Sequence, residues 1–170
     1  TLMELLVAMT VFLVVIGLSS GIFLQTLKSQ RTIVRMSENM NNVTLTLEQI
    51  AREVRTGFEF PQNTGGTYYD ILQFRDGRSG DYVSYTLIGG GEGQVGSIGR
   101  CASFQSSGCQ EQDSDDFDSL TSGNVDIESL TFFVQNDTGR PPLVTIAAKV
   151  LIDRDATLIL QTSVSSRILD

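Results

Sequence analysis

The sequence predicts an α+β protein in which one long N-terminal helix packs on an antiparallel β-sheet. The first observation is an apolar run over residues 1–24, which carries a single charge, at Glu4. The second is a stripe of apolar residues at helical spacing between Ile33 and Val54. The third is the alternation of apolar and polar residues in the last third of the chain. Such alternation indicates strands with one buried face, and the stripe indicates a helix that covers that face.

The helix is expected to run from the first residues to about Thr56, or roughly 80 Å at 1.5 Å per residue. About 20 apolar residues suffice to cross a bilayer, and residues 5–24 contain no charge. Gly57 then predicts the helix end. We therefore expect an apolar part (1–27) that projects from the head, an amphipathic part (28–56) packed on the head, and a globular β head (57–170). The stripe comprises Ile33, Met36, Met40, Val43, Leu47, Ile50 and Val54.

The head is expected to contain a hairpin and a three-stranded meander. The hairpin joins residues 70–75 to residues 82–88, and the meander uses strands near residues 127–134, 144–152 and 158–164. Residues 59–67 are expected to form a loop. The glycine-rich segment 89–99 is also expected to be a surface loop, since it lacks the Gly-Lys-Ser/Thr ending of a phosphate-binding loop.

Composition argues against several functional classes. The net charge of −8 makes nucleic acid an unfavourable partner, and we predict no specific nucleic-acid binding. The chain has no histidine, the commonest general base and metal ligand, and no Gly-x-Ser-x-Gly nucleophile motif. We therefore expect a structural protein without a cofactor rather than an enzyme.

Both ends of the chain resemble a known family. The segment TLMELLVAMTVF is similar to the N-terminus of type IV pilins and type II secretion pseudopilins, whose processed chains typically start Phe-Thr-Leu-x-Glu. The closing LQTSVSSR, residues 160–167, resembles the end of J-type pseudopilins and W-type minor pilins. The family's first residue, Phe, does not precede Thr1 here. No basic segment precedes the apolar run, so a mature or trimmed chain is expected.

The resemblance implies the pilin fold and a structural subunit of a type IV pilus-like filament. In this family the glutamate of that motif pairs with the N-terminal amine of a neighbouring subunit, and the resemblance therefore implies an assembly role for Glu4 and Thr1. The implied partners are further copies of the chain, a prepilin peptidase, an inner-membrane assembly platform and an assembly ATPase. The implied location is the inner membrane before assembly and the cell surface afterwards. We favour a main subunit, with a minor pilin or pseudopilin as the alternative.

The residues themselves leave two interpretations of Glu4. A charge inside a membrane span costs roughly 2.5–3.5 kcal/mol on insertion scales, so a carboxylate placed there indicates a partner. Thr1-x-x-Glu4 also fits a capping box, in which Glu4 only satisfies backbone donors at the helix start. A rival from another functional class is a membrane-anchored binding module whose helix is a plain anchor.

Gly17 and Gly21 lie inside the apolar run, where each glycine costs roughly 1 kcal/mol relative to alanine. In the related family this region can melt when subunits assemble. We therefore predict local unwinding around residues 17–21 in a filament. The alternative is that these small residues allow close helix packing.

Three further groups of residues are candidate sites in the head. Cys101 and Cys109 enclose a short polar loop, and in an exported protein they predict a disulfide, with two free thiols as the alternative. Asn136 begins a glycosylation sequon, as does Asn42, which lies on the helix. An acidic run could bind calcium, although a solvated loop is the favoured interpretation. Its carboxylates belong to Asp113, Asp115, Asp116 and Asp118.

Overall fold

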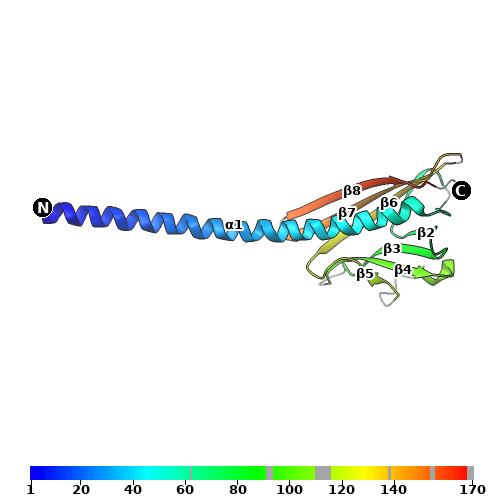
Figure 1. The fold of residues 1–170 in the computed structure, drawn as a ribbon, viewed down its shortest axis with the longest axis horizontal. Helices are drawn as coiled ribbons and strands as arrows, with labels where there is room; N and C mark the ends of the chain where they lie inside the picture. The colour runs from blue at the N-terminus through cyan, green and yellow to red at the C-terminus, as the bar shows by residue number, and fades with distance from the viewer. Residues whose placement is uncertain (62, 91–93, 110–115, 138, 154–155, 168–170) are drawn as a thin grey trace. The chain divides into compact units, whose positions relative to one another are not determined.

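The computed structural model describes residues 1–61, 63–90, 94–109, 116–137, 139–153 and 156–167. The chain divides into an N-terminal helix unit, Thr1–Glu38, and a head unit, Asn39–Asp170. One continuous helix, α1 (Leu2–Thr56), forms the first unit and begins the second (Figure 1). Antiparallel β-sheets complete the head. The predicted α+β class, with a long apolar helix and an antiparallel β head, is confirmed.

The first sheet contains the predicted meander. Its strand order is β1-β6-β7-β8, and each neighbouring pair is antiparallel. The meander strands are β6 (Asp126–Asn136), β7 (Leu143–Asp153) and β8 (Ala156–Ser165), close to the predicted ranges. The strand β1 (Asn63–Tyr69) lies where a loop was predicted over residues 59–67, so that prediction is wrong from Asn63 onward. Asn63 and residues 67–69 pair with β6, and the two glycines lie in the register irregularity between them.

The second sheet has the order β2-β3-β4-β5 and is also antiparallel. Its first pair is the predicted hairpin, β2 (Leu72–Arg75) and β3 (Tyr82–Ile88). The strands β4 (Ser97–Ser103) and β5 (Asp118–Ser119) extend it. The start of β4 overlaps the segment 89–99 that was predicted to be a loop. Within that segment, residues 91–93 lie outside the described residues.

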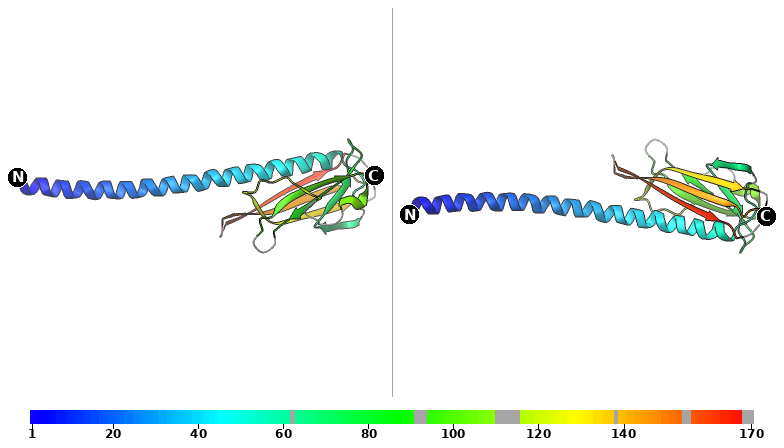
Figure 2. Two further views of the ribbon diagram at one scale, coloured as in Figure 1. Left: turned by 90° about the horizontal axis from the view of Figure 1, so that it is seen from below. Right: turned by 90° about the horizontal axis from the view of Figure 1, so that it is seen from above.

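The core of the head joins one face of each sheet to the C-terminal part of α1. Along the meander, the buried side chains alternate with exposed or half-buried ones, as the sequence predicted. The part of α1 within the head runs along both sheets (Figure 2). Its contribution to the core consists of Val43, Leu47, Ile50, Ala51 and Val54, with Thr46 also buried.

The buried part of the helical stripe starts later than predicted. Val43 is fully buried, whereas Ile33 and Met36 are 62% and 38% exposed. These two residues belong to the N-terminal helix unit, which ends at Glu38. Spacing alone placed them on the same stripe, but spacing does not say how far along the helix the core extends.

Helix α1 ends at Thr56, as predicted, and Gly57 follows it. A Cβ atom at residue 57 would lie 2.4 Å from Cδ2 of Phe74, so the glycine makes room for this core ring. The Ser166 hydroxyl donates to the Gly57 carbonyl at 2.7 Å, and the Arg167 N–H donates to the Arg55 carbonyl at 3.0 Å. The end of the chain therefore satisfies carbonyls that the helix terminus leaves free.

The predicted disulfide between Cys101 and Cys109 is present. Cys101 lies on β4, and Cys109 ends a short 3₁₀ helix, η1 (Ser106–Cys109). Both cysteines are buried with Phe117 in a small cluster beside the second sheet. The bridge therefore ties η1 to β4 at the edge of the head.

Candidate assembly site

The N-terminal helix unit exposes a continuous apolar surface. Between Leu2 and Leu24 the large apolar side chains are 45–84% exposed, and they occur on every side of the helix. Among the described residues, α1 is the helix that is long and apolar enough to cross a membrane, with a mean hydropathy of 2.5 over 18 residues, none of them buried. Water is a poor solvent for so large an apolar surface. The surface is therefore compatible with anchoring in a membrane.

Glu4 is the acidic residue in the first turn of α1, at the N-terminal end of this apolar surface. Its carboxylate Oε2 accepts a hydrogen bond from the Thr1 nitrogen at 3.0 Å, and both groups are exposed. The Thr1 carbonyl accepts from the backbone N–H groups of Glu4 and Leu5. This geometry is the Glu half of a capping box, one of the two interpretations left open by the sequence. Because both groups remain exposed, the carboxylate stays accessible to a second chain.

Two threonines further along the helix donate hydrogen bonds to backbone carbonyls of the same helix. The Thr10 hydroxyl donates to the Val7 carbonyl at 2.8 Å, and the Thr26 hydroxyl donates to the Ile22 carbonyl at 2.9 Å. Each hydroxyl is therefore hydrogen-bonded within its own helix and does not need water as a partner. Glu4 differs from these threonines, because its carboxylate has more lone pairs than one donor can fill and can accept further hydrogen bonds.

Gly17 and Gly21 lie within the unbroken helix. A Cβ atom at either position would meet no atom within 4 Å. The single chain therefore offers no contact that requires glycine there. Unwinding in a filament stays a prediction.

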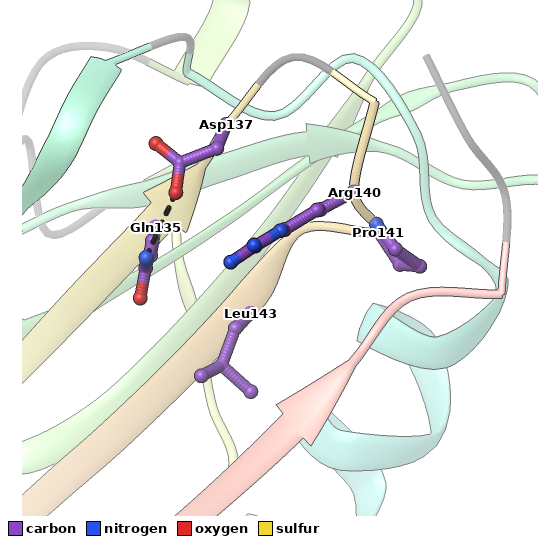
Figure 3. Close-up of a pocket in the computed structure, with 5 residues that line it drawn as sticks. All are labelled: Gln135, Asp137, Arg140, Pro141 and Leu143. Carbon is purple, nitrogen blue, oxygen red and sulfur yellow. Dashed lines mark hydrogen bonds between the residues drawn. The ribbon is translucent and has the colours of Figure 1, made fainter.

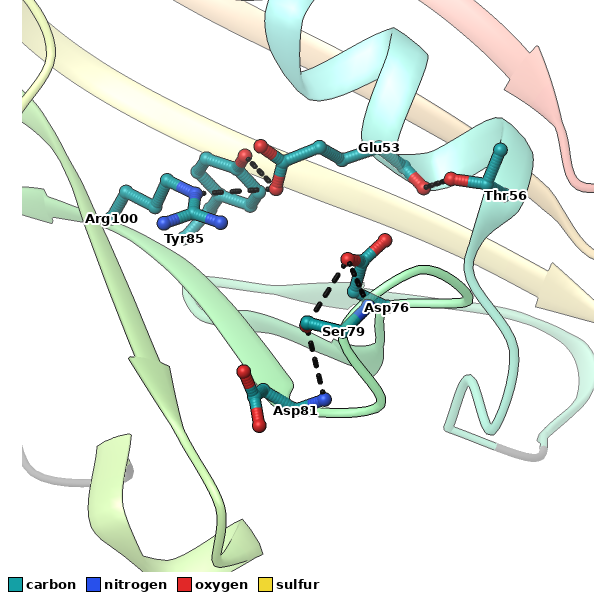
Figure 4. A network of polar contacts seen from close by, with 7 residues as sticks. All are labelled: Glu53, Thr56, Asp76, Ser79, Asp81, Tyr85 and Arg100. Carbon is teal, nitrogen blue, oxygen red and sulfur yellow. Dashed lines mark hydrogen bonds and ion pairs between the residues drawn. The ribbon is translucent and has the colours of Figure 1, made fainter.

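A polar network inside the head was not predicted from the sequence (Figure 4). The Glu53 carboxylate, on α1, accepts from the Tyr85 hydroxyl at 2.7 Å and from Nε of Arg100 at 3.2 Å. Tyr85 lies on β3 and Arg100 on the paired strand β4. The network therefore connects the helix to the second sheet. Glu53 carries no sequence signal, because a glutamate near the end of an amphipathic helix usually faces water.

The electrostatics of this network follow from its burial. Burial, together with the adjacent Glu53 carboxylate, raises the pKa of Tyr85 far above its ordinary value. Burial alone would lower the pKa of Arg100, but Glu53 and Tyr85 more than offset this and raise it. At neutral pH the network therefore consists of the uncharged Tyr85 phenol and the ion pair between Glu53 and Arg100. Its arrangement suits a structural connection.

Only part of the predicted acidic run lies among the described residues. Asp116 and Asp118 are exposed, while Asp113 and Asp115 lie outside the described residues. Within the described ranges, no three acidic or cysteine side chains form a group that could hold a metal ion. Calcium binding by the acidic run is untested.

The two sequon asparagines already make hydrogen bonds within the head. Nδ2 of Asn136 donates to the Phe60 carbonyl at 3.2 Å. Oδ1 of Asn42 accepts from the Ser122 N–H. Residue 138, which completes the Asn136 sequon, lies outside the described residues. A glycan at Asn136 would replace one of the two Nδ2 hydrogens of this half-buried amide, beside the hydrogen bond to Phe60.

A cavity of about 260 Å³ lies at the β6–β7 end of the head (Figure 3). Nε2 of Gln135 donates to Oδ2 of Asp137 at 2.9 Å on one side of it. Arg140 extends from the turn into the space between Gln135 and Leu143. The lining residues are Gln135, Asp137, Arg140, Pro141 and Leu143.

Comparison with models of protein families, with curated proteins and with solved structures found no match to this chain.

Proposed function

We propose that this chain is a structural subunit of a type IV pilus-like extracellular filament and that it polymerises through α1. The observation that carries the proposal is the exposed apolar surface of residues 2–24 with one accessible carboxylate at Glu4. In the filament the apolar helices bundle in the core and the β heads cover the outside. Before assembly, the same surface is covered by the membrane.

Burial of the helix supplies affinity, and Glu4 supplies register. Removing a Leu, Val or Ile side chain from water is worth roughly 1.5–3 kcal/mol, and the apolar surface supplies many of these. Lipid already covers that surface, however, so close packing must favour the bundle over the membrane. A carboxylate buried in such a bundle is costly unless it is paired. Pairing Glu4 with the N-terminal amine of a neighbour selects one stagger between helices.

The proposed partners follow from this cycle. A prepilin peptidase would generate the amine that Glu4 meets, and an inner-membrane platform with an assembly ATPase would extract the chain from the bilayer. Minor pilin and pseudopilin roles use the same helix chemistry and differ in abundance and position in the fibre. The main-subunit role therefore predicts that this chain is the bulk component of its fibre.

Substitution of Glu4 tests the proposal. Glu4→Gln and Glu4→Ala should leave the chain in the membrane at normal levels but abolish fibres in the sheared surface fraction, because the buried pair is lost. The matched control is Glu38→Gln, which removes an exposed carboxylate on the same helix beyond the apolar run. Both fractions are quantified by immunoblotting. Normal fibre yield from Glu4→Gln would contradict the proposed role of the charge.

The second candidate function is a membrane-anchored binding module. It is favoured by the length and hydropathy of α1, which satisfy the requirements of a single span without any fibre. A plain anchor tolerates Glu4→Ala and shows the chain in the membrane fraction only. The same fractionation therefore separates the two functions.

A further inference from the structure

The outer face of the first sheet has a second cavity, of about 440 Å³, within the head unit. This volume lies in the range of roughly 300–1,000 Å³ that small-molecule sites occupy. The opposite face of the same strands forms the core, so the cavity opens on the side away from it. Its lining residues are Tyr68, Thr131, Phe133, Thr145, Ala147 and Gln161.

Strand register explains how the cavity is built. Tyr68, Phe133 and Thr145 are cross-strand neighbours in one row, and Thr131, Ala147 and Gln161 form the next row. The lining therefore draws on all four strands of the sheet. Ala147 lies at the centre of its row, where its small side chain leaves the hollow between larger neighbours.

The aromatic wall is fixed in position by its neighbours. The Tyr68 and Phe133 rings lie 5.0 Å apart between centroids, with 53° between their planes. Gly66 on β1 has φ +84°, and a Cβ atom there would lie 2.2 Å from Cζ of Phe133. Glycine thus lets the Phe133 ring lie over β1 and support Tyr68. Tyr68 itself is 73% exposed, which leaves ring surface available to a ligand.

The chemistry of the lining selects the ligand class. It combines two aromatic rings with two threonine hydroxyls and a glutamine amide, and none of the six residues is acidic or basic. The Thr145 hydroxyl shares a hydrogen bond of 2.9 Å with Ser163, which orients it. An anionic ligand would find no cation in this lining and would meet a chain of net charge −8. A purely apolar ligand would offer no hydrogen bond to the Thr131 hydroxyl or the Gln161 amide.

We propose that this cavity binds a neutral sugar ring. The apolar C–H face of a pyranose packs on Tyr68, and its hydroxyl groups exchange hydrogen bonds with Thr131, Thr145 and Gln161. The cavity of Figure 3 lies one row further along the same face, because Gln135 pairs with Leu143 beside the row that contains Phe133. An oligosaccharide can therefore continue from one cavity into the next.

The test uses the full-length chain as a monomer in a detergent without a sugar head group, so its outcome does not depend on filament assembly. A labelled sample is screened on an array of neutral and acidic oligosaccharides, and hits are titrated by calorimetry. We expect binding to a neutral hexose-containing oligosaccharide. Tyr68→Ala should weaken it by roughly tenfold, and Gln161→Ala by roughly fivefold. Tyr68→Phe keeps the ring and should stay within roughly twofold.

Phe104→Ala is the matched control, because Phe104 is 90% exposed but lies on the disulfide loop. Its affinity should equal that of the unaltered chain. Each variant is shown to be folded if its thermal transition, measured by circular dichroism, matches that of the unaltered chain. The proposal is overturned if no neutral oligosaccharide binds, if only acidic ones bind, or if folded Tyr68→Ala binds as tightly as the unaltered chain. Equal losses from Phe104→Ala and Tyr68→Ala would also overturn it, since they indicate nonspecific aromatic contact.

Discussion

Glu53 places a carboxylate against two side chains of the second sheet, and the three groups work as a unit. The Tyr85 hydroxyl is a good partner for this carboxylate only while it keeps its proton. At neutral pH the phenol donates and the Arg100 guanidinium balances the charge. Loss of the phenolic proton would place two negative oxygens 2.7 Å apart.

This arrangement predicts a loss of stability in alkali. The pKa of Tyr85 is raised in the folded head by burial first and by Glu53 second, whereas the unfolded value is near 10. A raised folded pKa gives stability that is complete below about pH 10 and is lost as the pH rises above it. The free energy of unfolding, measured by denaturant titration from pH 8 to 11, should therefore fall above pH 10.

Tyr85→Phe supplies the control for this prediction, because it keeps the ring and removes the titrating group. It should be less stable at pH 8 by about 1 kcal/mol, the usual value of one hydrogen bond. Its stability should then depend less on pH between 10 and 11. Identical pH profiles for the two proteins would show that another group controls alkaline unfolding.

Several strands of the head were predictable because apolar and polar residues alternate along them. The buried positions of β6 and β7 mostly recur every second residue and face the core, as does Val164 of β8, so the apolar pattern located these strands. By contrast, β1 contains Gly65 and Gly66 and owes its conformation to its pairing with β6. The two-residue strand β5 is also defined by its partner, β4. Long-range pairing of this kind leaves little periodic signal in the strand itself.

The junction between α1 and the sheets predicts a steric effect at Gly57. Gly57→Ala would bring a Cβ atom to 2.4 Å from the Phe74 ring, which packs among buried neighbours. We expect a loss of about 1–3 kcal/mol in the free energy of unfolding, the usual cost of overpacking. The matched control is Gly123→Ala, because a Cβ there meets no atom within 4 Å. Equal stabilities of the Gly57→Ala and Gly123→Ala variants in denaturant titrations would contradict the close contact between residue 57 and Phe74.

The disulfide predicts a second effect at the level of elements. Replacing Cys101 and Cys109 together by alanine frees a loop with a sequence separation of 8. The chain-entropy relation then predicts a loss of about 2–3 kcal/mol. Denaturant titration of the double variant checks this value. An unchanged midpoint would mean that packing against Phe117 alone holds η1 in place.

At the scale of the whole chain, the sequence indicated the exposed apolar surface of α1 more fully than the cavities of the head. An uninterrupted apolar run is a local pattern, so it predicted the exposed apolar helix directly, whereas the assembly role of Thr1 and Glu4 follows from the family resemblance and stays a prediction. The Tyr68 cavity depends on the register of four strands separated along the chain, and Glu53 depends on which sheet meets α1. Such sites appear only when the tertiary arrangement is known. The filament remains a proposal that must be tested on assembled material.

The glycines of the apolar run predict a whole-molecule effect that rests on the proposed filament. Gly17→Ala with Gly21→Ala favours the helix by roughly 2 kcal/mol in total. If residues 17–21 unwind on assembly, the double variant should form fewer fibres while its membrane pool stays normal. The yields are compared by immunoblotting of sheared and membrane fractions. Close packing of small residues predicts normal yield instead, because alanine is also small.

The most direct measurement is electron microscopy of material sheared from the surface of the native cell, with sequencing of the protein in any fibres. The proposal predicts fibres whose bulk component is this chain, with Glu4 buried among packed N-terminal helices. Fibres in which the chain is rare or confined to the tip would assign it the minor-pilin role. A chain that stays in the membrane fraction, with no fibre containing it, would contradict the filament and leave the anchored module.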